Sequence, residues 1–164
     1  MKTVIFAPYA AKLRNGKMNP KNYPFWEELI GLLKEKGFHI VQIGVKSEEK
    51  INGTDSFLRE LSFSELEELI CKDETLVFSV DSFLPHFCRT LGRACIVLWG
   101  KSDPNIFGYP ENINLLKNRS NLRSKHDQWV FWEDVPYDPE VFVKPEEVIK
   151  SIKFIEAKVI TKCE

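Results

Sequence analysis

The sequence predicts an α/β fold: a Rossmann-like, doubly wound, mostly parallel sheet of about five to six strands with helices on both faces. Short apolar runs typical of buried strands alternate along the chain with segments whose apolar residues have helical spacing. In addition, residues 75–104 contain a strand, a capped helix and a second strand. Two parallel strands need such a crossover between them. We expect one domain over residues 1–164.

The first predicted unit is a strand followed by a polar loop. Residues 3–7 form a β-rich apolar run, and residues 8–22 are polar and contain Lys12, Arg14 and Lys17. Cations in a loop at the carboxyl end of a strand are suited to neutralising a diphosphate. The alternative is a solvated surface loop, which is the usual place for lysine and arginine.

A helix and two strands follow. Residues 23–36 have apolar residues at helical spacing, and Asn22 is a candidate N-cap. Residues 38–43 read as the second strand, and residues 57–61 as a short third strand. Between these strands lies a charged loop, residues 46–55.

The next helix is predicted from Ser64 to Cys71. Either Ser62 with Glu65 or Ser64 with Glu67 has the spacing of a capping box at its start.

The central unit carries the strongest functional signal. An apolar strand at residues 76–80 leads to Asp81-Ser82, where a helix N-cap belongs, and the helix then runs to Gly92. Helix N-termini bind phosphate, and doubly wound sheets bind their ligands at the carboxyl ends of the strands. His86, about one turn into the helix, would lean over the same crevice. The alternatives are that Asp81 is only a cap and His86 only a satisfied helix residue.

The C-terminal third is less regular. Phe107 and Tyr109 lie in a turn-rich segment and would flank a ligand or plug the loop, and residues 112–116 look like an edge strand. Residues 117–128 are basic, which indicates an anionic partner or a solvated loop. Residues 129–132 are apolar and are expected to pack back on the domain. A last helix is predicted from residue 145 to about residue 160.

Composition excludes several classes of protein. The chain has 43% hydrophobic and 29% charged residues and a net charge of −1, as in ordinary soluble proteins. This balance gives no reason to expect a nucleic-acid partner. No apolar run is long enough to span a membrane, and no signal peptide is visible, so we expect a cytoplasmic location.

The cysteines have no metal-binding pattern. None of the four is part of a C-x-x-C pair, and Cys71, Cys88 and Cys95 lie in apolar periodic segments. We therefore expect them to be buried free thiols, and we expect no metal site and no cofactor.

Several of these features occur together in one known family. Asp81-Ser82 and His86 form an Asp-Ser/Thr-x-x-x-His pattern, which is followed by Leu91-Gly92, an apolar strand, and a Gly-x-[ST]-[DE]-Pro turn at residues 100–104. This order resembles the C-terminal half of family 9 glycosyltransferases, the ADP-heptose:lipopolysaccharide heptosyltransferase family. Lys21-Asn22-Tyr23-Pro24 is similar to that family's Lys-x-Trp-Pro, and Gly44 with Glu48 to its Gly-x-x-x-Glu.

The resemblance implies one half of a GT-B fold, the half that holds the sugar nucleotide. It implies that the diphosphate lies at the start of the helix after Asp81-Ser82, held by backbone N–H groups, the Ser82 hydroxyl, His86 and Lys21. It also implies that Glu48 holds the ribose hydroxyls. The alternative is that Glu48 and the adjacent Glu49 are two solvated acids of a charged loop. The predicted nucleotide- and substrate-binding residues are therefore Lys21, Glu48, Asp81, Ser82, Phe83, Leu84 and His86. No catalytic residue is identified.

Two departures from the family pattern stand out. Phe83 replaces the family's usual glycine, and so places a bulkier residue where a nucleotide would approach the backbone. Met1-Lys2 leads directly into the first strand, so we expect no acceptor half before it. In the family, that half carries the carboxylate thought to act as catalytic base. We expect a homo-oligomer or a separate acceptor-domain partner to supply it.

Three functions follow as hypotheses. The first is glycosyl transfer from a nucleoside-diphosphate sugar, if an acceptor half complements this domain. The second is a non-catalytic module that binds or sequesters a nucleotide or nucleotide sugar. The third, which ranks lowest, is hydrolysis by a water that Asp81 or a nearby glutamate activates, because Asp81 is poorly placed for this if it caps the helix.

Overall fold

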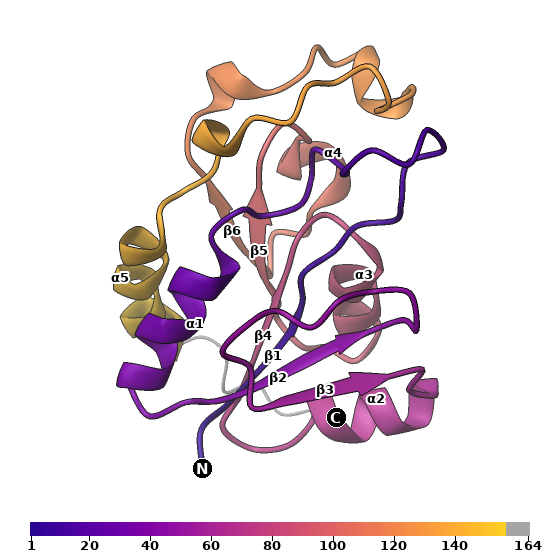
Figure 1. Cartoon of the computed structure of the whole chain (residues 1–164). Coiled ribbons are helices and arrows are strands. Elements are labelled where there is room, and N and C mark those ends of the chain that lie inside the picture. The colour runs from indigo at the N-terminus through magenta and orange to yellow at the C-terminus, as the bar shows by residue number, and fades with distance from the viewer. Residues whose placement is uncertain (157–164) are drawn as a thin grey trace.

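A computed structural model describes residues 1–156, whose strands form one sheet of six parallel strands in the order β3-β2-β1-β4-β5-β6 (Figure 1). This is the strand order of the Rossmann fold. The predicted fold class is confirmed, and the six strands are the upper value of the predicted range of five to six. The strands are β1 (Thr3–Ala7), β2 (His39–Gly44), β3 (Ser56–Arg59), β4 (Thr75–Ser79), β5 (Ile96–Trp99) and β6 (Ile113–Leu116).

Helices cover both faces of the sheet. The α-helices are α1 (Trp26–Glu35), α2 (Phe63–Ile70), α3 (Phe83–Thr90), α4 (Pro104–Phe107) and α5 (Pro145–Glu156). Helices α1 and α5 lie side by side on one face, and α2 and α3 lie on the other (Figure 1). Three short 3-10 turns, Arg119–Asn121, Asp127–Trp129 and Pro139–Val141, lie in the segment between β6 and α5. None of the described helices is long and apolar enough to cross a membrane.

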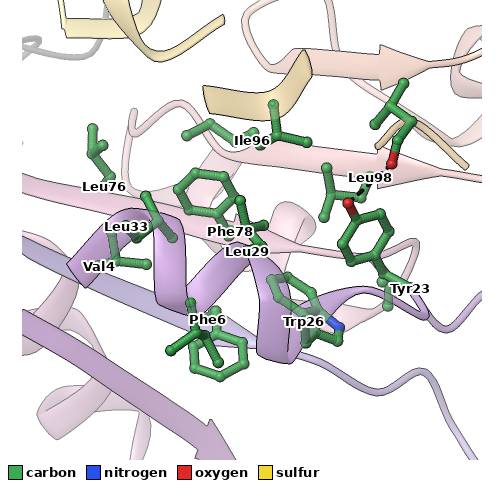
Figure 2. Close-up of a cluster of buried hydrophobic side chains, with 14 of the residues drawn as sticks. Val4, Phe6, Tyr23, Trp26, Leu29, Leu33, Leu76, Phe78, Ile96 and Leu98 are labelled. Carbon is green, nitrogen blue, oxygen red and sulfur yellow. Dashed lines mark hydrogen bonds between the residues drawn. The ribbon is translucent and has the colours of Figure 1, made fainter. Parts of the chain in front are cut away.

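Alternate residues of each central strand enter two separate apolar layers. In β1, Phe6 faces the α1 side, whereas Ile5 faces the α2 and α3 side. Figure 2 shows Trp26 and Leu29 of α1 lying against the sheet, and the rings of Trp26 and Phe6 have centroids 4.9 Å apart. Because both faces are covered, the strands read as continuous apolar runs in the sequence.

The structure changes some predicted element boundaries. Helix α1 begins at Trp26, and Asn22 is not its N-cap. The Asn22 side chain instead accepts a hydrogen bond from the Ala10 N–H at 2.8 Å and so ties down the loop after β1. For α2, the capping box is the Ser62–Glu65 pair. The predicted end of the last helix near residue 160 lies outside the described residues.

The prediction that residues 129–132 pack back on the domain is wrong for most of this segment. Trp129 is 72% exposed and Phe131 is 62% exposed. The segment lies beyond the carboxyl ends of the strands, so its rings meet loops rather than the sheet: Trp129 contacts Phe107, and Phe131 lies under the Arg14 guanidinium.

The cysteine prediction holds in part. Cys88 and Cys95 are free thiols in the core between the sheet and α3. Cys71 is half-buried at the C-cap of α2 and is not a free thiol, so the prediction fails there. Cys163 lies outside the described residues.

Two glycines test the packing with the same substitution. A Cβ at Gly100, just after β5, would lie 2.6 Å from the Phe142 ring, whereas a Cβ at Gly31 in α1 would meet nothing within 4 Å. Gly100→Ala is therefore expected to lower the free energy of unfolding by about 1–3 kcal/mol. Gly31→Ala is expected to raise it by about 0.5–1 kcal/mol, because alanine is the better helix former. Urea denaturation of both variants measures the free energy of unfolding. A change of the same sign in both variants would contradict this difference in packing.

Candidate functional site

An open cleft of about 1470 Å³ lies at the carboxyl ends of β1, β2 and β4. Its walls come from the loop after β1, the loop after β2 and the start of α3. All the residues predicted to bind a nucleotide line this cleft: Lys21, Glu48, Asp81, Ser82, Phe83, Leu84 and His86. They come from three separate parts of the sequence and meet because parallel strands end at the same edge of the sheet.

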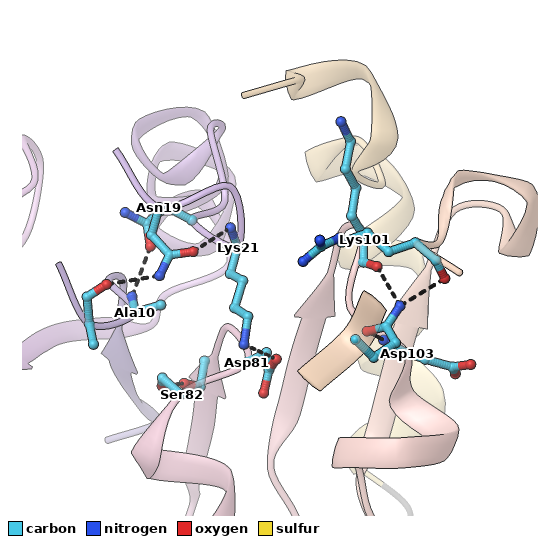
Figure 3. A network of polar contacts seen from close by, with 12 residues as sticks. Ala10, Asn19, Lys21, Asp81, Ser82, Lys101 and Asp103 are labelled. Atoms are coloured by element: carbon cyan, nitrogen blue, oxygen red, sulfur yellow. Dashed lines mark hydrogen bonds and ion pairs between the residues drawn. The ribbon is translucent and has the colours of Figure 1, made fainter. Parts of the chain in front are cut away.

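An ion pair joins two walls of the cleft. Lys21 Nζ lies 2.7 Å from Asp81 Oδ2, and the side chains are only 18% and 8% exposed (Figure 3). Within the described part of the chain, this carboxylate oxygen makes no hydrogen bond beyond the ion pair. Lys21 also lies near the rings of Phe107 and Trp132, 5.5 and 4.8 Å from their centroids. Asp81 therefore holds a cation in the cleft.

Ser82, and not Asp81, is the N-cap residue of α3, and no side chain caps the helix. The Ser82 hydroxyl is 3.0 Å from the Ser79 hydroxyl at the end of β4. The first helical N–H groups, those of Phe83 and Leu84, have no intrahelical acceptor. Pro85 has no N–H to offer. Leu84 is 1% exposed, so its side chain is part of the core. The start of α3 thus has no side-chain cap and lies on the cleft, an arrangement that is suited to an anion.

The Phe83 ring packs against two other aromatic rings. It stacks on Phe87 with centroids 5.5 Å apart and lies 5.9 Å from the ring of Phe63 in α2. These contacts keep the ring on the outer surface of α2 and α3. The phenylalanine that departs from the family pattern therefore lines the cleft with its ring held by other aromatic rings.

His86 is exposed on the cleft, and its side chain contacts that of Tyr109. Its Nδ1 lies 2.7 Å from the Tyr109 hydroxyl, and the two rings meet edge to face. The two aromatic residues for which the sequence left alternatives open therefore differ. Phe107 lines the cleft and packs on Trp129, whereas Tyr109 contacts the histidine.

The loop after β1 is organised by two asparagines. Asn19 is buried; its Nδ2 donates to the Ala11 carbonyl at 2.8 Å, and its Oδ1 accepts from the Lys21 N–H at 3.0 Å (Figure 3). Asn22 provides the second tie. Of the three cations that the sequence places in this loop, Lys12 and Lys17 line the cleft and Arg14 does not.

The structure distinguishes the two neighbouring acids of the loop after β2. Glu48 is half-buried, and its Oε2 accepts from the Val45 N–H at 3.2 Å, whereas Glu49 is exposed. A Cβ at Gly44 would lie 2.0 Å from this oxygen, so glycine is what lets the carboxylate lie against the strand end. Burial raises the pKa of Glu48, the Val45 N–H and Lys12 lower it, and Glu60 raises it.

Sequence reasoning missed Trp132 and Asn19. Trp132 reaches Lys21 only through tertiary contact, and it lies in a segment with no regular pattern. Asn19 stands between a methionine and a proline in a polar loop. In the sequence, such an asparagine cannot be distinguished from one in an exposed turn. Among residues 1–156, no group of three or more histidine, cysteine or acidic side chains is placed to hold a metal ion.

The raised pKa of Glu48 has a consequence for stability. The folded state binds this proton more tightly than the unfolded state, so stability falls as the pH rises through the range between the ordinary pKa and the folded one. Glu48→Gln keeps an acceptor for Val45 and removes that cost. We expect a gain below about 1 kcal/mol near neutral pH, because solvent screens a half-exposed group, and no gain below about pH 4.

Urea denaturation at both pH values measures this effect. Glu49→Gln is the matched control, because it removes the same charge from the exposed side of the loop and should keep the wild-type pH dependence. A Glu48→Gln gain that is equal at both pH values would contradict the interpretation.

Comparison with known proteins is consistent with this architecture. In a search of solved structures, Escherichia coli ADP-heptose lps heptosyltransferase II matches 94% of this chain and 46% of its own, with a TM-score of 0.63 and 16% identity. The dodecameric iron-containing heptosyltransferase TibC, in complex with ADP-D-beta-D-heptose, matches 88% of this chain and 36% of its own, with a TM-score of 0.58 and 16% identity. At this identity, the likeness shows the fold.

Sequence relatives identify the family. Lipopolysaccharide heptosyltransferase 1 of Salmonella typhimurium is 32% identical over 111 residues, which are 62% of this chain and 35% of the relative. The Escherichia coli protein of the same name is 30% identical over 133 residues, which are 74% of this chain and 42% of the relative. The chain thus spans less than half the length of these relatives. The model for glycosyltransferase family 9 (heptosyltransferase) matches residues 2–129. The chain belongs to glycosyltransferase family 9.

Proposed function

We propose that this chain binds a nucleoside-diphosphate sugar in the cleft and acts as the donor side of a glycosyl transfer. One observation carries the proposal: the uncapped start of α3, the Lys21 cation and the Glu48 carboxylate line the same cleft. A nucleotide sugar has the matching parts, namely an anionic diphosphate and a ribose diol.

The diphosphate is proposed to lie at the start of α3. Backbone N–H groups there, with the positive end of the helix dipole, favour an anion. Lys21 is already held over this position by Asp81, and His86 and the Ser82 hydroxyl add further polar groups. Among the described residues Lys21 pairs with one carboxylate, that of Asp81, so its ammonium retains donors for a phosphate oxygen.

Glu48 is proposed to accept hydrogen bonds from the ribose hydroxyls. A carboxylate accepts from both hydroxyls of a diol. The hydrogen bond to Val45 and the close approach to Gly44 hold it at the end of β2. Since TibC was solved with ADP-D-beta-D-heptose, ADP and ADP-heptose are the first ligands to test.

During transfer, an acceptor hydroxyl oxygen bonds to the sugar's anomeric carbon as the bond from that carbon to the diphosphate oxygen breaks. The nucleoside diphosphate leaves with the electron pair of the broken bond, and a base on the acceptor side takes the hydroxyl proton. Negative charge grows on the leaving group, and preorganised donors at that point lower the barrier. Lys21, His86 and the helix start are proposed to fill this role. The acceptor side is proposed to come from a second lobe, contributed by a partner chain or a second copy of this chain.

His86 offers the sharpest test of the donor site, because it is exposed and its removal should leave the fold intact. His86→Ala is expected to weaken ADP binding about tenfold or more, as for loss of a hydrogen bond to a charged group. Isothermal titration with ADP, UDP, GDP and CDP, and with ADP-heptose, measures affinity and identifies the base. A thermal shift confirms binding to the folded state.

His126→Ala is the matched control, because His126 is also exposed and lies off the cleft. It should bind as tightly as the unmodified protein. If none of the nucleotides binds the folded protein, or if both alanine variants lose affinity equally, the proposed donor site is wrong.

A further inference from the structure

We propose that Tyr109 is a positioning residue for His86: its hydroxyl fixes the imidazole so that Nε2–H is presented to the diphosphate. This inference rests on the proposed function, since it concerns how the donor site is built. Tyr109 itself does not line the cleft, so its effect on a ligand passes through the histidine.

The geometry supports a specific hydrogen bond rather than a surface contact. The Tyr109 hydroxyl lies 2.7 Å from Nδ1 of His86, a typical length for a strong hydrogen bond. The rings meet at 87° with centroids 5.5 Å apart, the edge-to-face arrangement that aromatic pairs prefer. Within residues 1–156, Nε2 has no hydrogen-bond partner.

The chemistry of imidazole gives this contact its consequence. A neutral histidine carries one proton, on either Nδ1 or Nε2, and the partner of one nitrogen determines which. When the tyrosine hydroxyl donates to Nδ1, the proton must be on Nε2. The free nitrogen is then a donor, which is the state that an anionic phosphate oxygen requires.

Tyr109 is itself anchored to the sheet. Its backbone carbonyl accepts from Asn114 Nδ2 at 2.9 Å, and Asn114 Oδ1 accepts from the indole N–H of the buried Trp99 at 2.9 Å. A Cβ at Gly108 would lie 2.6 Å from the Pro104 carbonyl and 3.1 Å from Trp99, so only glycine fits beside it. The backbone of Tyr109 is therefore tied to β5 and β6.

A second contact keeps the phenol ring in place. The Arg89 guanidinium, one turn after His86 in α3, lies 5.7 Å from the Tyr109 ring centroid. Arg89 also forms an ion pair with Glu111, two residues after the tyrosine. Helix α3 and the loop before β6 are thus joined by two further contacts besides the hydrogen bond.

Tyr109→Phe tests the proposal because it keeps both ring contacts and removes only the hydroxyl. Nitrogen-15 spectra of labelled histidine at about pH 8, above the ordinary titration of imidazole, report which nitrogen carries the proton. In the unmodified protein, His86 should show the Nε2–H tautomer, and in Tyr109→Phe a mixture. ADP affinity should fall about three- to tenfold, the effect of one hydrogen bond.

Tyr137→Phe is the matched control, since it removes a tyrosine hydroxyl that donates to the Asn22 carbonyl at 3.0 Å and does not touch His86. It should leave the His86 spectrum unchanged. In a His86→Ala background, Tyr109→Phe should cause no further loss of affinity, because the tyrosine acts only through the histidine.

The outcomes separate this proposal from the proposed function. If ADP binds and His86→Ala weakens it, but Tyr109→Phe changes neither the tautomer nor the affinity, the positioning role is wrong and the donor site stands. A further loss in the His86→Ala background would also overturn it. If no nucleotide binds the unmodified protein, the donor site and the positioning role are both overturned.

Discussion

The ion pair between Lys21 and Asp81 determines the shape of the candidate site. It connects the loop after β1 to the start of α3 across the cleft, with both side chains largely removed from solvent. Removing one partner of a buried ion pair typically costs about 3–5 kcal/mol, because the other charge is left unpaired. An arrangement of this kind is poor evidence for stability but is well suited to holding a cation where a ligand needs it.

The supports of the ion pair are backbone contacts rather than further charges. Asn19 and Asn22 fix the turn that carries Lys21, and each makes its bonds to main-chain groups of the same loop. Aromatic rings of Phe107 and Trp132 flank the ammonium. Phe107 packs against the core between the sheet and α2 and α3, whereas Trp132 comes from a segment whose neighbours are exposed.

Membership of glycosyltransferase family 9 and the length of its relatives bear on the proposed reaction. The match covers less than half of each relative, and the reaction proposed for this chain therefore needs an acceptor side as well as the donor cleft. A domain that corresponds to one half of a longer protein is expected to have a cleft that is open on one side. Its polar groups are fixed by contacts within the half, so the cleft does not depend on a second lobe for its form.

The sequence by itself determined the fold class, most element positions and the residues that gather at the cleft. It did so because buried parallel strands are continuous apolar runs and because a helix start leaves a local signature at Asp81-Ser82. It did not determine which of those two residues is the N-cap, which loop acid is buried, or where the Phe83 ring lies.

Tertiary structure decided the positions of the Asp81 and Phe83 side chains, because each has a partner distant in the chain: Lys21 for Asp81 and Phe63 for Phe83. The contact of Tyr109 with His86 is of the same kind. Such contacts have no periodicity and leave no local pattern in the sequence. They arise only once the sheet has brought the ends of its strands together.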